Sequence, residues 1–193
     1  MNRLFTLAAV VAALSSVQAF AQARNFEGFS LGANADFDRS TVDATGGTSD
    51  NGTSTGLGLQ AEYSWALGRN FVLGLGASAN TGNRKAGTYV NGNDAYSKDR
   101  YSIDLIPGVA ATDKVLVFAK VSSLAGNGAS SDGTSTASLQ GLGYGLGFRA
   151  LINNNLFWQA GYDSVTFNDV TFGNGTVASF KGNILSLGIG YKF

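Results

Sequence analysis

Apolar and polar residues alternate along the last part of the chain. Leu185, Leu187, Ile189, Tyr191 and Phe193 are apolar, whereas the residues between them are serine, glycine or lysine. Because successive side chains of a β-strand point to opposite faces, this alternation predicts a strand over residues 181–193 with one wholly apolar face. The alternative interpretation of this segment is the final strand of a soluble sandwich.

Seven further segments alternate in the same way. In residues 139–151, for example, Leu142, Tyr144 and Leu146 alternate with glycines. The other segments span residues 27–38, 55–67, 71–81, 98–110, 115–124 and 156–167. Each has roughly 10 to 13 residues, the length that a tilted strand needs to cross a bilayer. The pattern therefore predicts an all-β protein, an eight-stranded antiparallel up-and-down transmembrane β-barrel.

The connections between these segments alternate between short and long. Short turns are expected at residues 68–70, 111–114 and 152–155, and long polar loops at residues 39–54, 82–97, 125–138 and 168–180. The loops consist mainly of glycine, serine, threonine, asparagine and aspartate, which bury little apolar surface. This alternation is typical of a membrane barrel with short periplasmic turns and long extracellular loops.

The charged residues of the strands determine which face meets lipid. A basic side chain facing lipid at the bilayer midplane costs about 2–4 kcal/mol, and an acidic one costs less. We therefore expect the apolar face to point outward and the charged side chains to fill the lumen as a structural network. The predicted members of this lumen network are Glu62, Arg100, Asp104, Lys120, Arg149 and Asp163, together with Asn34, Gln60 and Gln159.

Residues 1–23 have the pattern of a secretory signal peptide. Arg3 supplies a positive charge, residues 4–17 are mostly apolar, and Ala21-Gln22-Ala23 fits a cleavage site. The sequence thus predicts a signal peptide over residues 1–23 and a barrel domain over residues 24–193. A cut after Ala19 is the alternative, and an uncleaved membrane anchor is less favoured because a spanning helix needs about 20 apolar residues.

Composition argues against most other function classes. Charged residues make up 13% of the chain and balance at 13 basic and 13 acidic, so no basic excess suggests a nucleic-acid partner. The chain contains neither histidine nor cysteine, which removes the usual catalytic base and the usual zinc and iron ligands. We therefore expect no enzyme, no metal and no cofactor. Paired carboxylates remain conceivable as an acid and a base, namely Asp36 with Asp38 or Asp104 with Asp163, but structural charges are the favoured interpretation.

The segments 141–167 and 184–193 resemble small eight-stranded outer-membrane barrels. These are the OmpA-type barrel, the OmpX and attachment-invasion group, and the opacity-type porin family. The resemblance implies a place in the Gram-negative outer membrane, in contact with membrane lipid and lipopolysaccharide. It also implies that the terminal strand, with Leu187, Ile189, Tyr191 and Phe193, is the signal for the barrel-assembly machinery.

Three functions remain open from the sequence. The first is a structural barrel with a plugged polar lumen that displays four extracellular loops. The second is an adhesin or surface-recognition protein that binds a host-surface ligand through those loops, because loops on a rigid scaffold commonly carry binding. The third is a small or gated porin.

Overall fold

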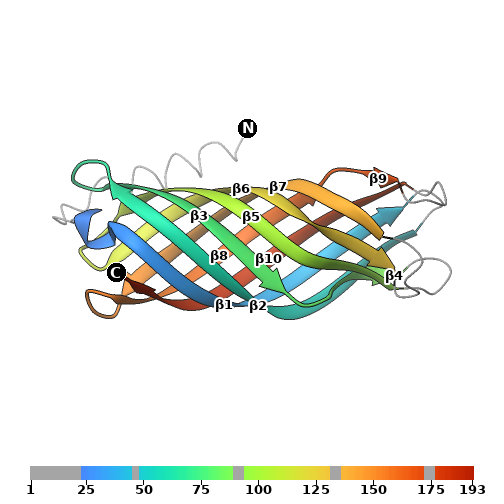
Figure 1. Cartoon of the computed structure of the whole chain (residues 1–193), viewed down its shortest axis with the longest axis horizontal. Coiled ribbons are helices and arrows are strands. Elements are labelled where there is room, and N and C mark those ends of the chain that lie inside the picture. Colours follow the sequence, from blue (N-terminus) through green and yellow to red (C-terminus); the bar gives the residue numbers. More distant parts are fainter. Residues whose placement is uncertain (1–22, 45–47, 89–93, 131–135, 172–176) are drawn as a thin grey trace, which may run out of the picture.

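Ten strands make up almost the whole of the described chain (Figure 1). The computed structural model describes residues 23–44, 48–88, 94–130, 136–171 and 177–193. The predicted signal peptide lies outside these ranges except for Ala23, which begins a short 3-10 helix, η1 (Ala23–Phe26). Among the described residues, no helix is long and apolar enough to span a membrane.

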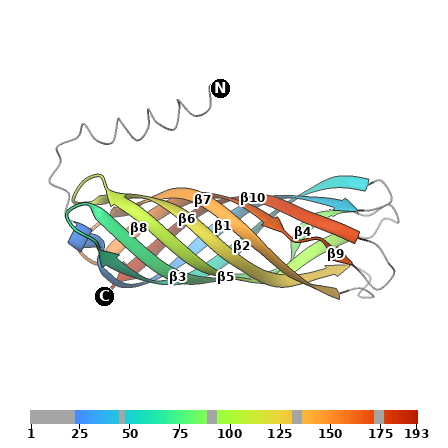
Figure 2. The same ribbon diagram turned by 90° about the horizontal axis from the view of Figure 1, so that it is seen from above.

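Eight long strands close into one antiparallel barrel, as predicted. They are β1 (Gly28–Ala44), β2 (Thr48–Ala66), β3 (Phe71–Thr81), β5 (Asp94–Ala110), β6 (Val115–Ser130), β7 (Thr136–Leu151), β8 (Leu156–Phe167) and β10 (Val177–Lys192). Each pairs with its neighbour in sequence, and β1 pairs with β10 to close the barrel. Two views at right angles show the same closed, elongated shape (Figures 1 and 2).

Three tight connections lie together at one end of the barrel, next to the C-terminus (Figure 1). They join β2 to β3, β5 to β6 and β7 to β8, where the sequence predicted short turns. Gly68 in the first turn has φ +99°, a left-handed conformation that glycine adopts without steric cost. We call this end the short-turn end and the other the long-loop end.

The predicted long loops are wrong in extent, because ordered strands occupy much of them. β1 continues to Ala44 and β2 starts at Thr48, whereas the sequence analysis assigned residues 39–54 to a loop. β5, β6, β7 and β10 extend in the same way, and β4 (Arg84–Thr88) and β9 (Val170–Thr171) are additional short strands. These extensions stand beyond the lipid, where their outer face needs no apolar residues, and the alternation that marks a membrane strand is therefore absent.

The strand extensions form a two-sheet head at the long-loop end. β3 ends at Thr81 and β8 ends at Phe167, so the upper strands divide into a sheet of β2, β1, β10 and β9 and a sheet of β4, β5, β6 and β7. Among the described residues, no strand ladder joins β2 to β4 or β7 to β9. We call these strand extensions the head. On β1 the head starts after Arg39, and on the other strands it comprises the residues at the same level of the barrel.

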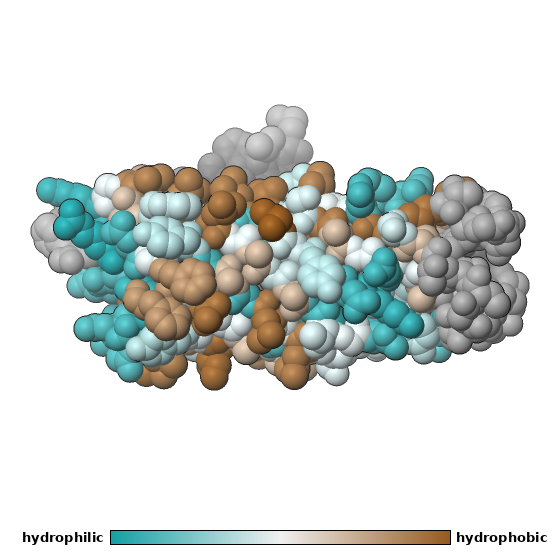
Figure 3. All heavy atoms as spheres, in the orientation of Figure 1, coloured by the Kyte–Doolittle hydropathy of each residue, from teal (hydrophilic) through white to brown (hydrophobic). Residues whose placement is uncertain are grey.

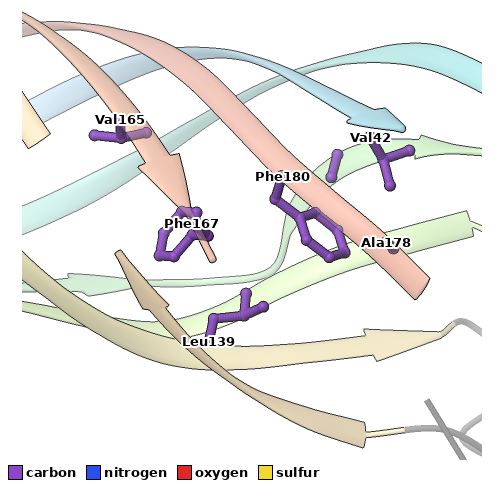
Figure 4. Packing of buried hydrophobic residues seen from close by; sticks show 7 residues of the cluster. Val42, Leu139, Val165, Phe167, Ala178 and Phe180 are labelled. Atoms are coloured by element: carbon purple, nitrogen blue, oxygen red, sulfur yellow. The ribbon is translucent and has the colours of Figure 1, made fainter. Parts of the chain in front are cut away.

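Apolar side chains fill the space between the two sheets of the head (Figure 4). The cluster contains Val42, Ala86, Leu139, Val165, Phe167, Ala178 and Phe180. No large apolar side chain of the head is exposed among the described residues. The head therefore has the polarity of a water-soluble protein, with an apolar core and a polar surface.

The lower barrel has the opposite polarity. Large apolar side chains point outward there, including Leu57 (66% exposed), Leu146 (67%) and Ile189 (63%). On the face drawn in Figure 3, these apolar residues cover the part of the barrel nearer the short-turn end, and more hydrophilic residues follow towards the long-loop end. We call this outward apolar surface the apolar band. A contiguous apolar surface of this kind is stable in lipid and not in water, so the apolar band marks the membrane-spanning part.

Candidate functional site: the polar lumen

Arg149 of β7 and Glu62 of β2 form a buried ion pair in the middle of the lumen. Arg149 Nη2 lies 2.6 Å from Glu62 Oε2, and both side chains are 5% exposed or less. Ser64 donates a hydrogen bond to the same carboxylate at 2.6 Å. The Arg149 guanidinium also lies 4.4 Å from the centre of the buried Phe157 ring, a favourable cation–π distance.

A chain of amide side chains extends this pair across the barrel. Gln159 accepts a hydrogen bond from Arg149 Nε at 3.3 Å and donates to Gln60 at 2.8 Å and to Asn34 at 3.0 Å. Asn34 in turn donates to Gln60 at 3.1 Å. The polar side chains from β1, β2, β7 and β8 thus satisfy one another inside the lumen, as buried polar groups must.

A second ion pair lies on the wall formed by β6, β7 and β8 and joins its two outer strands. Lys120 Nζ lies 2.7 Å from Asp163 Oδ2, with the lysine side chain 27% exposed. Asp104 of β5 accepts a hydrogen bond from Ser122 at 2.6 Å. Every predicted network residue therefore points into the barrel, and Asp104 has a hydroxyl group as its side-chain partner.

Two arginines and two aspartates form a further cluster towards the head. Arg84 Nη2 lies 2.9 Å from Asp36 Oδ2, and Arg100 Nη2 lies 2.7 Å from Asp38 Oδ2. Asn80 and Ser186 also donate hydrogen bonds to Asp36, at 2.5 and 2.8 Å. Of the predicted network, Arg100 belongs to this cluster and not to the central one.

The sequence analysis missed Asp36, Asp38 and Arg84 as members of the network. Arg84 lay in a predicted loop, yet β4 carries it into the barrel, where its side chain is 2% exposed. The sequence analysis considered Asp36 and Asp38 as a catalytic pair, but in the structure both form ion pairs with arginines. Their alternation with the outward Phe37 was the signal that places them in the lumen.

The described lumen holds more carboxylates than cations. The carboxylates are Asp36, Asp38, Glu62, Asp104 and Asp163, and the cations are Arg84, Arg100, Lys120 and Arg149. A cavity of about 90 Å³ lies between them, lined by polar side chains such as Ser78 and Ser102. This volume is large enough for several water molecules. Among the described residues, no group of three acidic side chains is arranged to hold a metal ion.

An apolar layer lies on each side of this polar region. Towards the short-turn end, Phe26 of η1 packs with Val72, Ala110 and Leu116, and all four are buried. η1 is held there by hydrogen bonds from the Ala23 backbone N–H to the Arg69 carbonyl (2.9 Å) and from Asn25 to the Asp113 carbonyl (2.9 Å). Towards the head, the apolar core described above covers the lumen.

The outer edge of β2 is joined to β4 by a carboxylate. Asp50 accepts hydrogen bonds from the backbone N–H groups of Asn51 and Thr88, at 2.8 and 2.7 Å. These bonds favour the charged form and hold the pKa of Asp50 below its usual value. Nearby, the Lys85 ammonium lies 2.7 Å from Asp94, which raises the pKa of Lys85 and lowers that of Asp94.

The predicted assembly residues lie on the outward face of β10. Ile189 is 63% exposed and Phe193 67% exposed, and Leu187 and Tyr191 point the same way. The Phe193 backbone N–H donates to the Phe29 carbonyl at 2.8 Å, and the two rings lie 5.9 Å apart. The C-terminus is thus fastened to the first strand at the short-turn end.

A closed antiparallel barrel with an apolar outer band and a charged lumen defines a transmembrane β-barrel protein. A family model described as "Outer membrane protein beta-barrel domain" matches residues 6–193. The chain belongs to this family, and it is an outer-membrane protein of the Gram-negative type.

Solved structures with the same fold are distant in sequence. The attachment invasion locus protein Ail of Yersinia pestis, solved in complex with the heparin analogue sucrose octasulfate, is 19% identical, with a TM-score of 0.54 over 86% of this chain and 99% of that chain. Neisserial surface protein A is 17% identical, with a TM-score of 0.52 over 86% of this chain and 100% of that chain. No curated protein matches the sequence significantly.

Proposed function

We propose that this protein is a non-conducting barrel that holds its head and loops at the cell surface. The observation that best supports this proposal is the order of the layers along the lumen. The apolar layer around Phe26, the Arg149–Glu62 pair with its amide chain, and the apolar core of the head follow one another along the barrel axis. An ion crossing the membrane has to pass all three, and an apolar layer gives it no hydration.

Conductance across a planar lipid bilayer tests this proposal. Folded protein purified from outer membranes is expected to insert without producing steady current steps. Insertion is checked independently by the gel-mobility shift that folded barrels show when they are boiled in detergent. Steady steps from the inserted, unmodified protein would contradict the proposal and support the small-porin alternative.

We also propose surface recognition through the loops at the tip of the head. The head brings the strand ends that flank residues 45–47, 89–93, 131–135 and 172–176 to one end of the barrel (Figure 1), on a platform with its own apolar core. Ail, which has the same fold, was solved with a sulfated sugar. A sulfated or host-surface ligand is therefore the class to test here.

Loop replacement separates recognition from barrel folding. Each of residues 45–47, 89–93, 131–135 and 172–176 is replaced by a two-residue Asn-Gly turn, which closes an antiparallel hairpin. Loss of cell or heparin binding with an unchanged gel-mobility shift supports recognition. Full binding by a protein that lacks all four loops contradicts it.

We propose cleavage of a signal peptide after Ala23, and N-terminal sequencing of the membrane-inserted protein tests it. We propose that the barrel-assembly machinery reads the outward face of β10, and substitution of Phe193 by serine is expected to reduce the amount of folded barrel in the outer membrane. We further propose that the protein is not an enzyme, since each lumen carboxylate has an ion-pair or hydroxyl partner.

A further inference from the structure

A polar belt crosses four neighbouring strands between the apolar band and the outer part of the head. On β2, β1, β10 and β8, its outward residues are Thr53, Thr55, Arg39, Thr41, Lys181, Asn183, Ser164 and Thr166, all of them exposed except the half-buried Thr41. Most of these side chains are neutral hydroxyls or amides. The two cations, Arg39 and Lys181, are the only charges among them and lie on neighbouring strands.

The register of β1 and β10 brings these two cations close together. Arg39 lies opposite Asn183, and Lys181 lies opposite Thr41, two positions further along. Arg39 and Lys181 are therefore diagonal neighbours on one face, and the Cβ atoms of such neighbours lie somewhat less than about 7–8 Å apart. Both side chains are long enough to reach a single anion between them. Thr166, opposite Lys181 on β8, adds a hydroxyl donor beside the pair.

Neither cation is neutralised by the described protein. Among the described residues, no ion pair within 4.0 Å involves Arg39 or Lys181. The nearest outward carboxylate on β1 is Asp43, opposite Ser179, which makes it the other diagonal neighbour of Lys181, on the side away from the membrane, but in the described part of the chain it forms no ion pair with Lys181. Both cations therefore keep free hydrogen-bond donors on the outer surface.

The surface directly below the pair is apolar. Phe37 lies opposite Leu185, one outward position nearer the membrane than Arg39 and Asn183, and these side chains are 46% and 45% exposed. Tyr162 of β8 lies beside Leu185 and is 54% exposed. A ligand that meets both surfaces has a negative group at the level of Arg39 and hydrocarbon at the level of Phe37.

We propose that Arg39 and Lys181 bind the phosphate group of the glycolipid of the outer leaflet, whose acyl chains lie on Phe37, Leu185 and Tyr162. The outer leaflet of a Gram-negative outer membrane is made of lipopolysaccharide, in which phosphates sit on sugars directly above the acyl chains. The order of charge and hydrocarbon along that molecule matches the order along β1 and β10. Arginine also matches the geometry of a phosphate with two parallel hydrogen bonds.

Binding of purified lipid A to the folded full-length protein in detergent tests the site. Native mass spectrometry measures the affinity for lipid A with both phosphates and for its enzymatically dephosphorylated form. Each cation near an anionic lipid surface contributes about fivefold in affinity, so the Arg39→Gln/Lys181→Gln double variant is expected to bind phosphorylated lipid A about 30-fold more weakly. The dephosphorylated form is expected to bind the unmodified protein and the double variant equally.

Two control variants separate charge from folding. The exchange variant Arg39→Lys/Lys181→Arg keeps both charges and is expected to bind within a few-fold of the unmodified protein. Lys114→Gln removes an exposed cation at the short-turn end and is expected to change nothing. Equal affinity of the double variant and the unmodified protein for phosphorylated lipid A would overturn the proposal. Full competition by inorganic phosphate would also overturn it, because it would reveal a plain anion site with no part for the lipid chains.

Discussion

Arg149 and Glu62 meet across the lumen although they are 87 positions apart in the sequence. They lie on β7 and β2, which are on opposite walls of the closed barrel. The contact therefore joins two walls that no backbone ladder connects. An arginine and a carboxylate in this setting stabilise the fold only as a pair, because each alone would be a buried uncompensated charge.

Substitution of one member of this pair is expected to destabilise the barrel strongly. Glu62→Gln leaves the Arg149 guanidinium without a counter-ion, and breaking a buried pair in this way costs about 3–5 kcal/mol. Urea unfolding in lipid vesicles, followed by the fluorescence of Trp65 and Trp158, measures the free energy of unfolding. The double variant Glu62→Leu/Arg149→Leu removes both charges and should lose less free energy of unfolding than Glu62→Gln. If Glu62→Gln is as stable as the unmodified protein, the ion pair does not stabilise the barrel.

Inward glycines in the lower barrel make room for the large side chains of the lumen. A Cβ atom on Gly190 would collide with the Phe157 ring, whereas a Cβ atom on Gly161 would meet only the Leu146 carbonyl oxygen, at 3.7 Å. Overpacking of this kind costs about 1–3 kcal/mol, so Gly190→Ala is expected to destabilise the barrel and Gly161→Ala to have little effect. The same urea titration compares the two variants, and equal stabilities would mean that Phe157 moves aside without cost.

The height of the apolar band can be measured with a single outward charge. Leu146 is 67% exposed within the band, and Ser138 is an exposed residue of the same strand in the head. Leu146→Arg is expected to lower the free energy of unfolding in vesicles by about 2–4 kcal/mol, and Ser138→Arg to leave it almost unchanged, because a charge is costly only where it faces hydrocarbon. A similar cost at both positions would show that the head is not outside the lipid.

The contact between β2 and β4 is expected to weaken in acid. The backbone N–H groups of Asn51 and Thr88 lower the pKa of Asp50 from 3.8 in the folded protein. The stabilisation that the ionised carboxylate gives to this contact is therefore complete above pH 3.8, and it is lost as the pH falls through the lowered pKa of the folded protein. Amide hydrogen exchange of Thr88, expressed as protection relative to an unfolded peptide, is expected to show this loss. Asp50→Asn keeps the shape without the charge, and its Thr88 protection should be independent of pH in the same range. A pH dependence that persists in Asp50→Asn would assign the effect to another group.

The sequence was sufficient for the membrane-spanning half of the barrel because that half obeys one rule. Outward residues such as Leu146 meet hydrocarbon and inward residues such as Arg149 do not, so a period of two marks both the strands and their orientation. The three tight turns and the direction of the charged side chains follow from the same pattern. Pairing in the lumen, by contrast, depends on the register of distant strands, which a single strand does not encode.

The head could not be predicted because it follows a different rule. Its outer face is in water and tolerates threonine, serine and glycine, which also make up ordinary loops. Arg84 illustrates the difficulty: its neighbours in sequence are polar or small, and only the packing of β4 against β2 places it beside Asp36. A close approach at Gly52, where a Cβ atom would collide with the Lys85 backbone, makes that packing possible.

The reversal of polarity along β1 sets how far the loops stand from the bilayer. Phe37 is the last exposed apolar residue of the strand, and β1 continues as a paired strand to Ala44. At about 3.4 Å per residue, this continuation carries the tip roughly 20 Å beyond the hydrocarbon, less any tilt. The reach of the tip is therefore a matter of strand length alone, and residue pairs added to the head would lift the loops through the surrounding sugar layer without altering the part that lies in the membrane.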